Sequence, residues 1–171
     1  MSGFFEPRAF PFVARLEAGF ADVLAELEAL EHAAFVEAPD SLTTVEDGYD
    51  ERGWHYYDLV GAAGRDLAAH RARCPRTTAL LDEVPRLENA GFSRFAAGTQ
   101  LYPHRGELEG VLRCHLPLVV PAGDLGIRIG DETRRWATGR CHVFDDTLEH
   151  TAWNRGAGDR VVLLVTFGRG A

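Results

Sequence analysis

The sequence predicts a mainly β domain with N-terminal helices packed outside it, whose core is a two-sheet sandwich or a small barrel. Two observations support this fold class. Helical and turn-rich segments precede residue 90, whereas after it short runs of Val, Leu, Ile and Phe alternate with glycine-containing turns. A chain of 171 residues suits one domain with a substantial core. We therefore expect residues 1–171 to form a single domain, with a helical and loop part over 1–90 and the β core over 91–168.

The first ninety residues contain the expected helices. Over residues 10–33 apolar side chains recur at steps of three or four, which is the helical period. Turn-forming residues over 38–53 then predict a long surface loop, which we expect to be mobile without substrate and able to fold over a site. The alanine-rich stretch that ends before Pro75, and "TTALLDEVP", which ends at Pro85, predict two further helices.

The second part contains the expected strands. We place them at 92–96, 100–104, 111–120, 126–130, 134–137, 140–145, 150–154 and 160–167. Turns such as "PAGD", "IGDE" and "GAGD" separate them at the short spacing typical of sandwiches and barrels.

The period of two in a strand assigns polar side chains to faces. Arg113 and His115 share one face of their strand, opposite Cys114. By the same rule Arg160 shares a face with Leu164 and Thr166, and His104 shares one with Gln100 and Tyr102. Charged groups that face into a β core need water, a ligand or one another, so these positions predict a ligand-binding mouth.

Composition restricts the partners and the compartment. The net charge of −8 argues against nucleic acid or an anionic membrane as the main partner. Cys74, Cys114 and Cys141 show no motif spacing, and we find neither a signal peptide nor a transmembrane stretch, so a reduced, cytoplasmic location is expected. Cys114 and Cys141 lie in apolar runs and are expected to be buried packing residues.

Two histidines are candidate metal ligands. His104 in "QLYPH" and His150 in "FDDTLEH" each lie at one end of an expected strand, beside a turn. A lone strand histidine is more often structural, but iron sites often use two histidines and a carboxylate and leave open positions for substrate and oxygen. The usual carboxylate position, two residues after the first histidine, is Gly106, which cannot ligate.

Dense, ordered motifs surround these histidines. They are a His-x-Gly at 104–106, an Arg-x-His at 113–115, an acidic pair at 145–146 ahead of His150, and an arginine ten residues beyond it. With these motifs the segment from Phe92 to Phe167 resembles the aspartyl/asparaginyl β-hydroxylase family, and "RGWHYYDL" extends the match more faintly upstream. The resemblance implies a double-stranded β-helix (a cupin-like jelly roll) and an Fe(II)- and 2-oxoglutarate-dependent dioxygenase that consumes O₂.

The resemblance also implies roles at the metal. His104 and His150 match the two iron ligands of the family. Gly106 matches the glycine that replaces the carboxylate ligand. Asp146 matches an aspartate that orients metal-bound water without ligating the metal.

Further matches imply how the cosubstrate and substrate are bound. Arg160 matches the arginine that binds the distal carboxylate of 2-oxoglutarate, and His115 and Ser93 match positions that contact this cosubstrate. Arg113 matches the arginine that receives the carboxylate of a substrate aspartyl residue. Trp54, in the fainter upstream part, borders the substrate cleft in this interpretation.

The chain departs from the family pattern in two places. It ends at "VTFGRGA", without the Trp-His-Pro segment that often follows the last strand. Val111 stands where some relatives have a second arginine, so recognition of the substrate carboxylate is expected to be weaker or different.

Three functions are compatible with these residues. The first is β-hydroxylation of an aspartyl or asparaginyl residue, or of a related carboxylate- or amide-bearing substrate, on a small peptide or a biosynthetic intermediate. The second is a 2-oxoglutarate-dependent halogenase that uses the open position at Gly106. The third is a non-catalytic cupin-like module that binds a carboxylate through Arg113 and Arg160.

Overall fold

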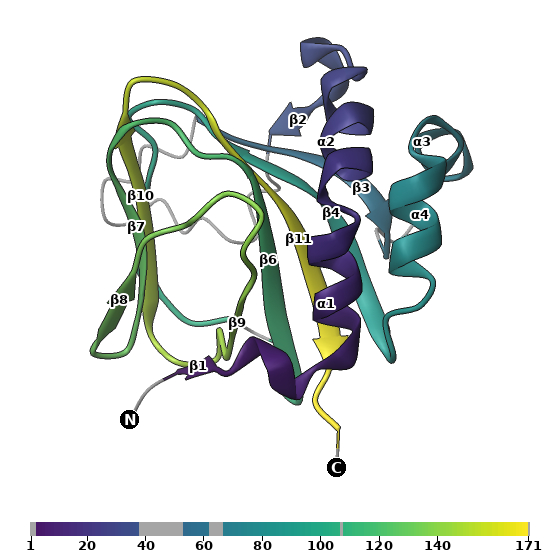
Figure 1. Ribbon diagram of the computed structural model, residues 1–171. Helices are drawn as coiled ribbons and strands as arrows, with labels where there is room; N and C mark the ends of the chain where they lie inside the picture. Colours follow the sequence, from purple (N-terminus) through teal and green to yellow (C-terminus); the bar gives the residue numbers. More distant parts are fainter. Residues whose placement is uncertain (1–2, 38–52, 62–66, 107, 171) are drawn as a thin grey trace.

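Two antiparallel β-sheets face each other, and helices cover the outer face of the larger sheet (Figure 1). The computed structural model describes residues 3–37, 53–61, 67–106 and 108–170. The seven-stranded sheet has the order β1 (Phe4–Phe5), β9 (His142–Phe144), β6 (Val111–Val119), β11 (Arg160–Gly168), β4 (Leu87–Phe95), β3 (Trp54–Val60) and β2 (Val36–Glu37). The four-stranded sheet has the order β5 (Gln100–His104), β10 (His150–Gly156), β7 (Gly123–Ile129) and β8 (Glu132–Arg134).

The helices come before the main strands. They are the 3₁₀ turns η1 (Pro7–Ala9) and η2 (His32–Ala34) and the α-helices α1 (Pro11–Ala18), α2 (Phe20–Glu28), α3 (Ala68–Arg73) and α4 (Pro75–Leu81). α1 and α2 lie over one face of the large sheet, with α4 beside α2 (Figure 1). None of the described helices is both long and apolar enough to span a membrane.

Two apolar clusters form the core, one on each face of the large sheet. Between the helices and the sheet, Leu16 and Val23 pack with Leu116 and Leu163. All four side chains are almost fully buried, and truncating any one of them to alanine would cost about 2–5 kcal/mol. Between the sheets, Ile127 and other apolar side chains form the second cluster, which surrounds the site.

The expected mainly β fold with external helices is confirmed, and so are the faces assigned to β6 and β11. Cys114 packs under the helices, whereas Arg113, His115 and Arg160 line the space between the sheets. All three cysteines are buried and free, as expected for Cys114 and Cys141.

Several expected elements differ in the structure. The single helix over 10–33 is two helices, interrupted at Gly19, where an added Cβ would lie 2.5 Å from the Leu80 side chain of α4. The loop expected over 38–53 lies, apart from Gly53, outside the described residues. The large sheet also takes β1, β2 and β3 from the first ninety residues, and β8 ends at Arg134, so the strand expected over 134–137 is wrong.

The face assigned to β5 is also wrong. Leu101 and His104 both line the space between the sheets, although they are three positions apart and regular alternation would put them on opposite faces. His104 pairs with His150 and Leu101 pairs with Ala152, so the ladder is interrupted there. An extra residue in one strand changes which side chains face inward, and such a bulge is common beside an active site.

Candidate active site

One pocket between the two sheets collects every site residue that the sequence suggested. Its walls include Trp54, Ser93, His104, Gly106, Arg113, His115, Asp146, His150 and Arg160. These residues come from β3, β4, β5, β6, β10, β11 and the turns beside β5 and β9. Residues more than a hundred positions apart in sequence therefore meet in one space, and apolar side chains complete its walls.

His104 and His150 face each other at this pocket. They are register partners on the paired strands β5 and β10, and their ring centroids lie 4.1 Å apart. His150 is 6 % exposed. Burial, followed by the neighbouring His104 ring, lowers the pKa of His150 to about 4. A neutral His150 at physiological pH has a lone pair available for a metal ion.

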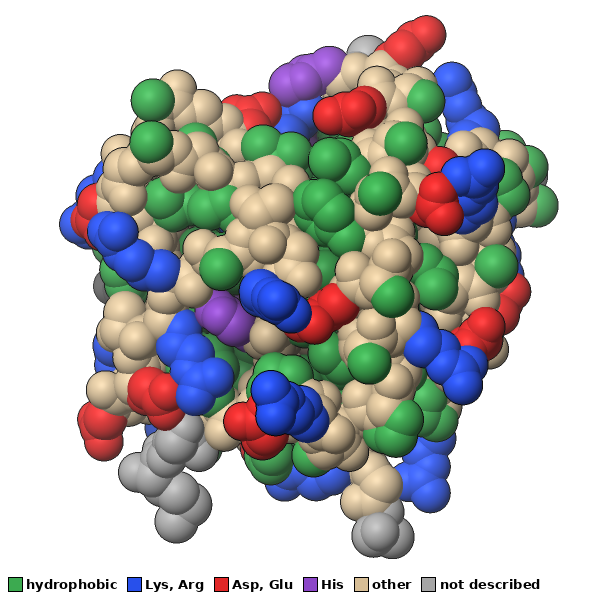
Figure 2. All heavy atoms as spheres, viewed as in Figure 1, with side chains coloured by type: hydrophobic (Ala, Val, Ile, Leu, Met, Phe, Trp, Pro, Cys, Tyr) green, Lys and Arg blue, Asp and Glu red, His purple; other side chains and the backbone are tan. Residues whose placement is uncertain are grey.

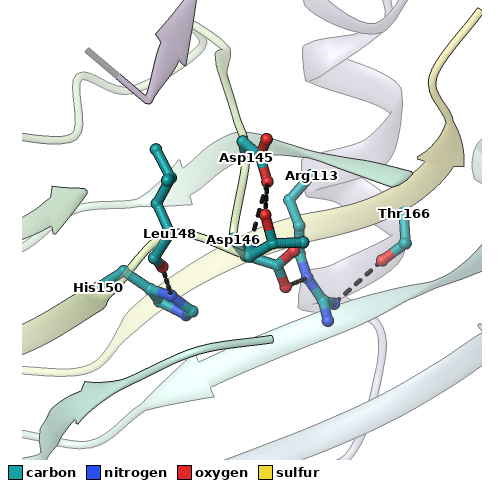
Figure 3. Close-up of polar contacts among 7 residues, drawn as sticks. Arg113, Asp145, Asp146, Leu148, His150 and Thr166 are labelled. Atoms are coloured by element: carbon teal, nitrogen blue, oxygen red, sulfur yellow. Dashed lines mark hydrogen bonds and ion pairs between the residues drawn. The ribbon is translucent and has the colours of Figure 1, made fainter. Parts of the chain in front are cut away.

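The backbone fixes which nitrogen of each ring is available. The Nδ1 of His104 lies 2.7 Å from the carbonyl oxygen of Tyr102. The Nδ1 of His150 lies 3.0 Å from the carbonyl oxygen of Leu148 (Figure 3). A carbonyl oxygen only accepts, so Nδ1 carries the hydrogen in both rings. Nε2 is then the unprotonated nitrogen of each neutral ring, as in metal-binding histidines whose other nitrogen donates to a carbonyl.

Asp146 fills the space beside Gly106. The Gly106 N–H donates to the Asp146 carbonyl oxygen at 2.7 Å, and a Cβ at position 106 would lie 2.5 Å from Oδ2 of Asp146. Asp146 is 2 % exposed, and its Oδ1 has no hydrogen-bond partner among the described residues. A side chain at position 106 would therefore collide with Asp146, and Asp146 contributes a carboxylate to the described lining of the pocket.

Arg113 holds this carboxylate in place. Its Nε donates to Oδ2 of Asp146 at 2.5 Å, and its Nη1 donates to the hydroxyl of Thr166 at 3.0 Å (Figure 3). Neither of these two contacts involves Nη2, the third guanidinium nitrogen of Arg113. Sequence reasoning assigned Arg113 to the substrate, and the pair with Asp146 adds a link from Arg113 to the metal side of the pocket.

Arg160 is a buried cation without an acid partner in the described residues. Its side chain is 1 % exposed, and its Nε and Nη2 have no hydrogen-bond partner there. The guanidinium lies over the ring of Phe95, 4.0 Å from the centroid. Burial lowers the pKa of Arg160 to about 9, so the group stays charged at neutral pH. A buried charge without a counter-ion is costly unless a ligand supplies one, and this position suits a carboxylate.

The remaining predicted residues form the wall next to Arg160. The indole N–H of Trp54 donates to Oγ of Ser93 at 3.1 Å, which ties β3 to β4. Burial, followed by Arg160 and then Arg113, holds the pKa of His115 well below its ordinary range. His115 is therefore a neutral hydrogen-bonding group at physiological pH.

Sequence reasoning missed three residues of the site. Tyr56 lines the pocket, and burial raises the pKa of its phenol. Thr166 accepts from Arg113, and Trp136 lies against Arg160. Arg160 and Thr166 share a face of β11, and this pattern could have predicted Thr166 as a site residue. Trp54 and Tyr56 share a face of β3, and this pattern could have predicted Tyr56. Trp136 lies in the irregular segment between β8 and β9, where periodicity gives no signal.

Fold and site together define a jelly-roll domain with a two-histidine pocket, and comparison with known proteins specifies the family. The model of the aspartyl/asparaginyl β-hydroxylase family matches residues 17–170. The chain belongs to this family. Among the described residues, no cluster of three or more His, Cys, Asp or Glu side chains could hold a metal.

Individual relatives are longer than this chain. It is 35% identical over 167 residues to the ornithine lipid ester-linked acyl 2-hydroxylase of Rhizobium tropici, covering 95% of this chain and 59% of the relative. It is 29% identical over 171 residues to human aspartyl/asparaginyl β-hydroxylase, covering 92% of this chain and 22% of the relative. These names support a hydroxylase. The chain thus spans about three fifths of the Rhizobium tropici protein and about a fifth of the human protein.

A solved structure supports the fold. HygX from Streptomyces hygroscopicus, crystallised with nickel and 2-oxoglutarate bound, superposes with a TM-score of 0.55 over 90% of this chain and 79% of that one. The identity is 14%, so this likeness shows the fold alone. The expected double-stranded β-helix is confirmed.

Proposed function

We propose that this hydroxylase is an Fe(II)- and 2-oxoglutarate-dependent dioxygenase acting on a carboxylate- or amide-bearing substrate such as an aspartyl or asparaginyl side chain. The observation that carries the proposal is one pocket containing two facing imidazoles, each held at Nδ1 by a backbone carbonyl, and a buried arginine without an acid partner in the described residues. Two imidazoles suit a divalent transition metal, and the arginine suits the far carboxylate of a dicarboxylate that chelates the same ion.

The chain's own residues have separate tasks in this proposal. His104 and His150 hold the iron through Nε2. Arg160 binds the distal carboxylate of 2-oxoglutarate. Iron with 2-oxoglutarate and O₂ supplies the oxidation that converts a substrate C–H bond into C–OH and releases succinate and CO₂.

Other residues position the reactants. Asp146 accepts a hydrogen bond through Oδ1 from water near the histidines, because Oδ2 is already paired with Arg113. His115 and Ser93 contact the cosubstrate. The Nη2 of Arg113 is left to bind a substrate carboxylate or amide, and Trp54 forms the neighbouring wall.

A second candidate substrate is the acyl chain of a lipid. Outside the polar groups assigned above, the pocket is walled by apolar side chains, among them Leu101, Ile127 and Phe144. The similarity to a protein named an acyl 2-hydroxylase favours the same candidate. On the face of the molecule in Figure 2, acidic and basic side chains are interspersed with apolar ones, and no basic patch gathers there among the described residues.

The test is substrate-dependent turnover. The protein with Fe(II), 2-oxoglutarate and O₂ is offered aspartyl peptides, asparaginyl peptides and acyl lipids, and succinate and product mass are measured. We expect one substrate class to yield succinate and a product heavier by one oxygen, and His104→Ala to abolish both. Full turnover by His104→Ala would refute the proposal. A chlorinated product in high chloride would favour the halogenase, and metal-independent binding of 2-oxoglutarate would favour the binding module.

A further inference from the structure

Trp136 contacts two of the polar residues that the proposed function assigns to the cosubstrate. It lies between β8 and β9, is 5 % exposed, and lines the pocket. Its indole Nε1 lies 3.3 Å from Nδ1 of His115, and its ring lies 4.6 Å from the guanidinium carbon of Arg160. One side chain therefore touches both His115 of β6 and Arg160 of β11.

The contact with His115 determines the tautomer of that ring. An indole N–H can only donate, so Nδ1 of His115 must be the accepting, unprotonated nitrogen. The ring is neutral because burial and the nearby arginines keep its pKa low. A neutral imidazole carries one hydrogen, and here it must be on Nε2. Trp136 thus turns His115 into a hydrogen-bond donor through Nε2, which is the role that an anionic ligand requires.

The contact with Arg160 holds the cation without consuming its donors. The guanidinium lies near two aromatic rings, 4.0 Å from the centroid of Phe95 and 4.6 Å from that of Trp136. Ring faces attract a cation but offer no lone pair comparable to a carboxylate oxygen. Nε and Nη2 of Arg160 accordingly keep their hydrogens unpaired among the described residues. An acidic side chain in the place of Trp136 would occupy these donors.

We propose that Trp136 is a positioning residue for the carboxylate-binding end of the pocket: its ring face holds Arg160, and its N–H holds His115 as the Nε2–H tautomer. This inference rests on the proposed function, in which the pocket binds 2-oxoglutarate. Trp136 does not contact reacting atoms. By holding both side chains, it orients a charged donor, Arg160, and a neutral donor, His115, toward a single dianionic ligand.

Two substitutions separate the two contacts, and a third provides the control. Trp136→Phe keeps a ring face near Arg160 and removes the N–H, whereas Trp136→Leu removes both. Trp153→Phe also removes an indole N–H, which donates to Asp124 at 3.1 Å, and Trp153 does not line the pocket. Urea unfolding of each variant checks that it folds.

The measurements are the tautomer of His115, by ¹⁵N NMR of the metal-free protein, and the Kd of 2-oxoglutarate in the presence of Mn²⁺. In both wild type and Trp153→Phe we expect His115 to be the Nε2–H tautomer. We also expect these two proteins to bind 2-oxoglutarate with the same Kd. In Trp136→Phe the ring should become a mixture of tautomers and Kd should rise about fivefold, as for loss of one hydrogen bond. In Trp136→Leu Kd should rise about 50-fold.

The outcomes that overturn the inference differ from those that overturn the proposed function. An unchanged His115 tautomer in Trp136→Phe, or an unchanged Kd in folded Trp136→Leu, would remove the positioning role while wild type still binds 2-oxoglutarate. Failure of wild type to bind 2-oxoglutarate with Mn²⁺ would remove the proposed function, and with it the assignment of this end of the pocket to a carboxylate.

Discussion

Replacing Gly106 by alanine should disturb the site through Asp146. The added Cβ would lie 2.5 Å from Oδ2, 2.7 Å from Cγ and 3.0 Å from Oδ1 of Asp146. Gly106 is not among the glycines with positive φ, so its backbone suits alanine and the steric contact alone decides the outcome. The carboxylate is buried and cannot turn away cheaply, because Oδ2 is bonded to Nε of Arg113 at 2.5 Å.

The cost follows from how far the carboxylate must move. An ordinary Cβ contact begins near 3.4 Å, so the carboxylate has to shift by most of an ångström. Overpacking of this kind costs about 1–3 kcal/mol, and full rupture of a buried ion pair about 3–5 kcal/mol. Because the pair with Arg113 would be stretched and only partly lost, we expect a loss of about 2–3 kcal/mol. For a domain of this size the melting temperature should fall by roughly 5–10 °C.

The assay is urea unfolding of Gly106→Ala beside Gly158→Ala. Gly158 lacks a positive φ, and a Cβ there would meet only Pro121, at 3.9 Å. We expect Gly158→Ala to change the free energy of unfolding by less than about 0.5 kcal/mol. Equal stabilities of the two variants would refute the claim that Asp146 excludes a side chain from position 106.

Three further predictions concern other buried groups. Arg160→Leu should weaken 2-oxoglutarate binding about 100-fold without lowering the stability of the ligand-free protein, because it removes an unpaired buried cation; a parallel loss of stability would indicate a structural role. Burial lowers the pKa of His142 to about 4, so between pH 6.5 and 4 this histidine binds more protons in the unfolded chain than in the folded one. His142 should therefore contribute on the order of 2 kcal/mol to the decrease in unfolding free energy as the pH is lowered from 6.5 to 4. His142→Asn should reduce this fall, and an identical pH profile would contradict the assignment. Burial raises the pKa of Cys74 to about 11, and Cys114 and Cys141 are also buried, so a thiol reagent should react only after unfolding; rapid modification of the native protein would disagree.

Long central strands allowed part of the site to be predicted from the sequence. The period of two placed Arg113 and His115 on the face opposite Cys114, because β6 is regular between β9 and β11 over these residues. The resemblance supplied the pairing of His104 with His150, which composition and spacing alone left open. In the regular strand β6, local geometry determines the side-chain direction.

The rest depends on contacts between segments far apart in the chain. The bulge in β5 depends on its pairing with β10, so alternation put Leu101 on the wrong face. The contact of Gly106 with Asp146 arises where two turns meet, so the sequence analysis identified the glycine but could not predict the contact. The role of Trp136 requires the simultaneous approach of two strands, and a residue in an irregular segment has no periodicity that could predict it.

The central claim is that His104 and His150 together bind one metal ion on which 2-oxoglutarate binding depends. Calorimetric titration of wild type, His104→Ala and His55→Ala with Mn²⁺ tests it most directly, because His55 lies on β3 between the pocket residues Trp54 and Tyr56 but does not line the pocket. We predict one ion per chain for wild type and His55→Ala, and an affinity reduced at least about 100-fold for His104→Ala. Equal Mn²⁺ affinity in all three proteins would contradict the account.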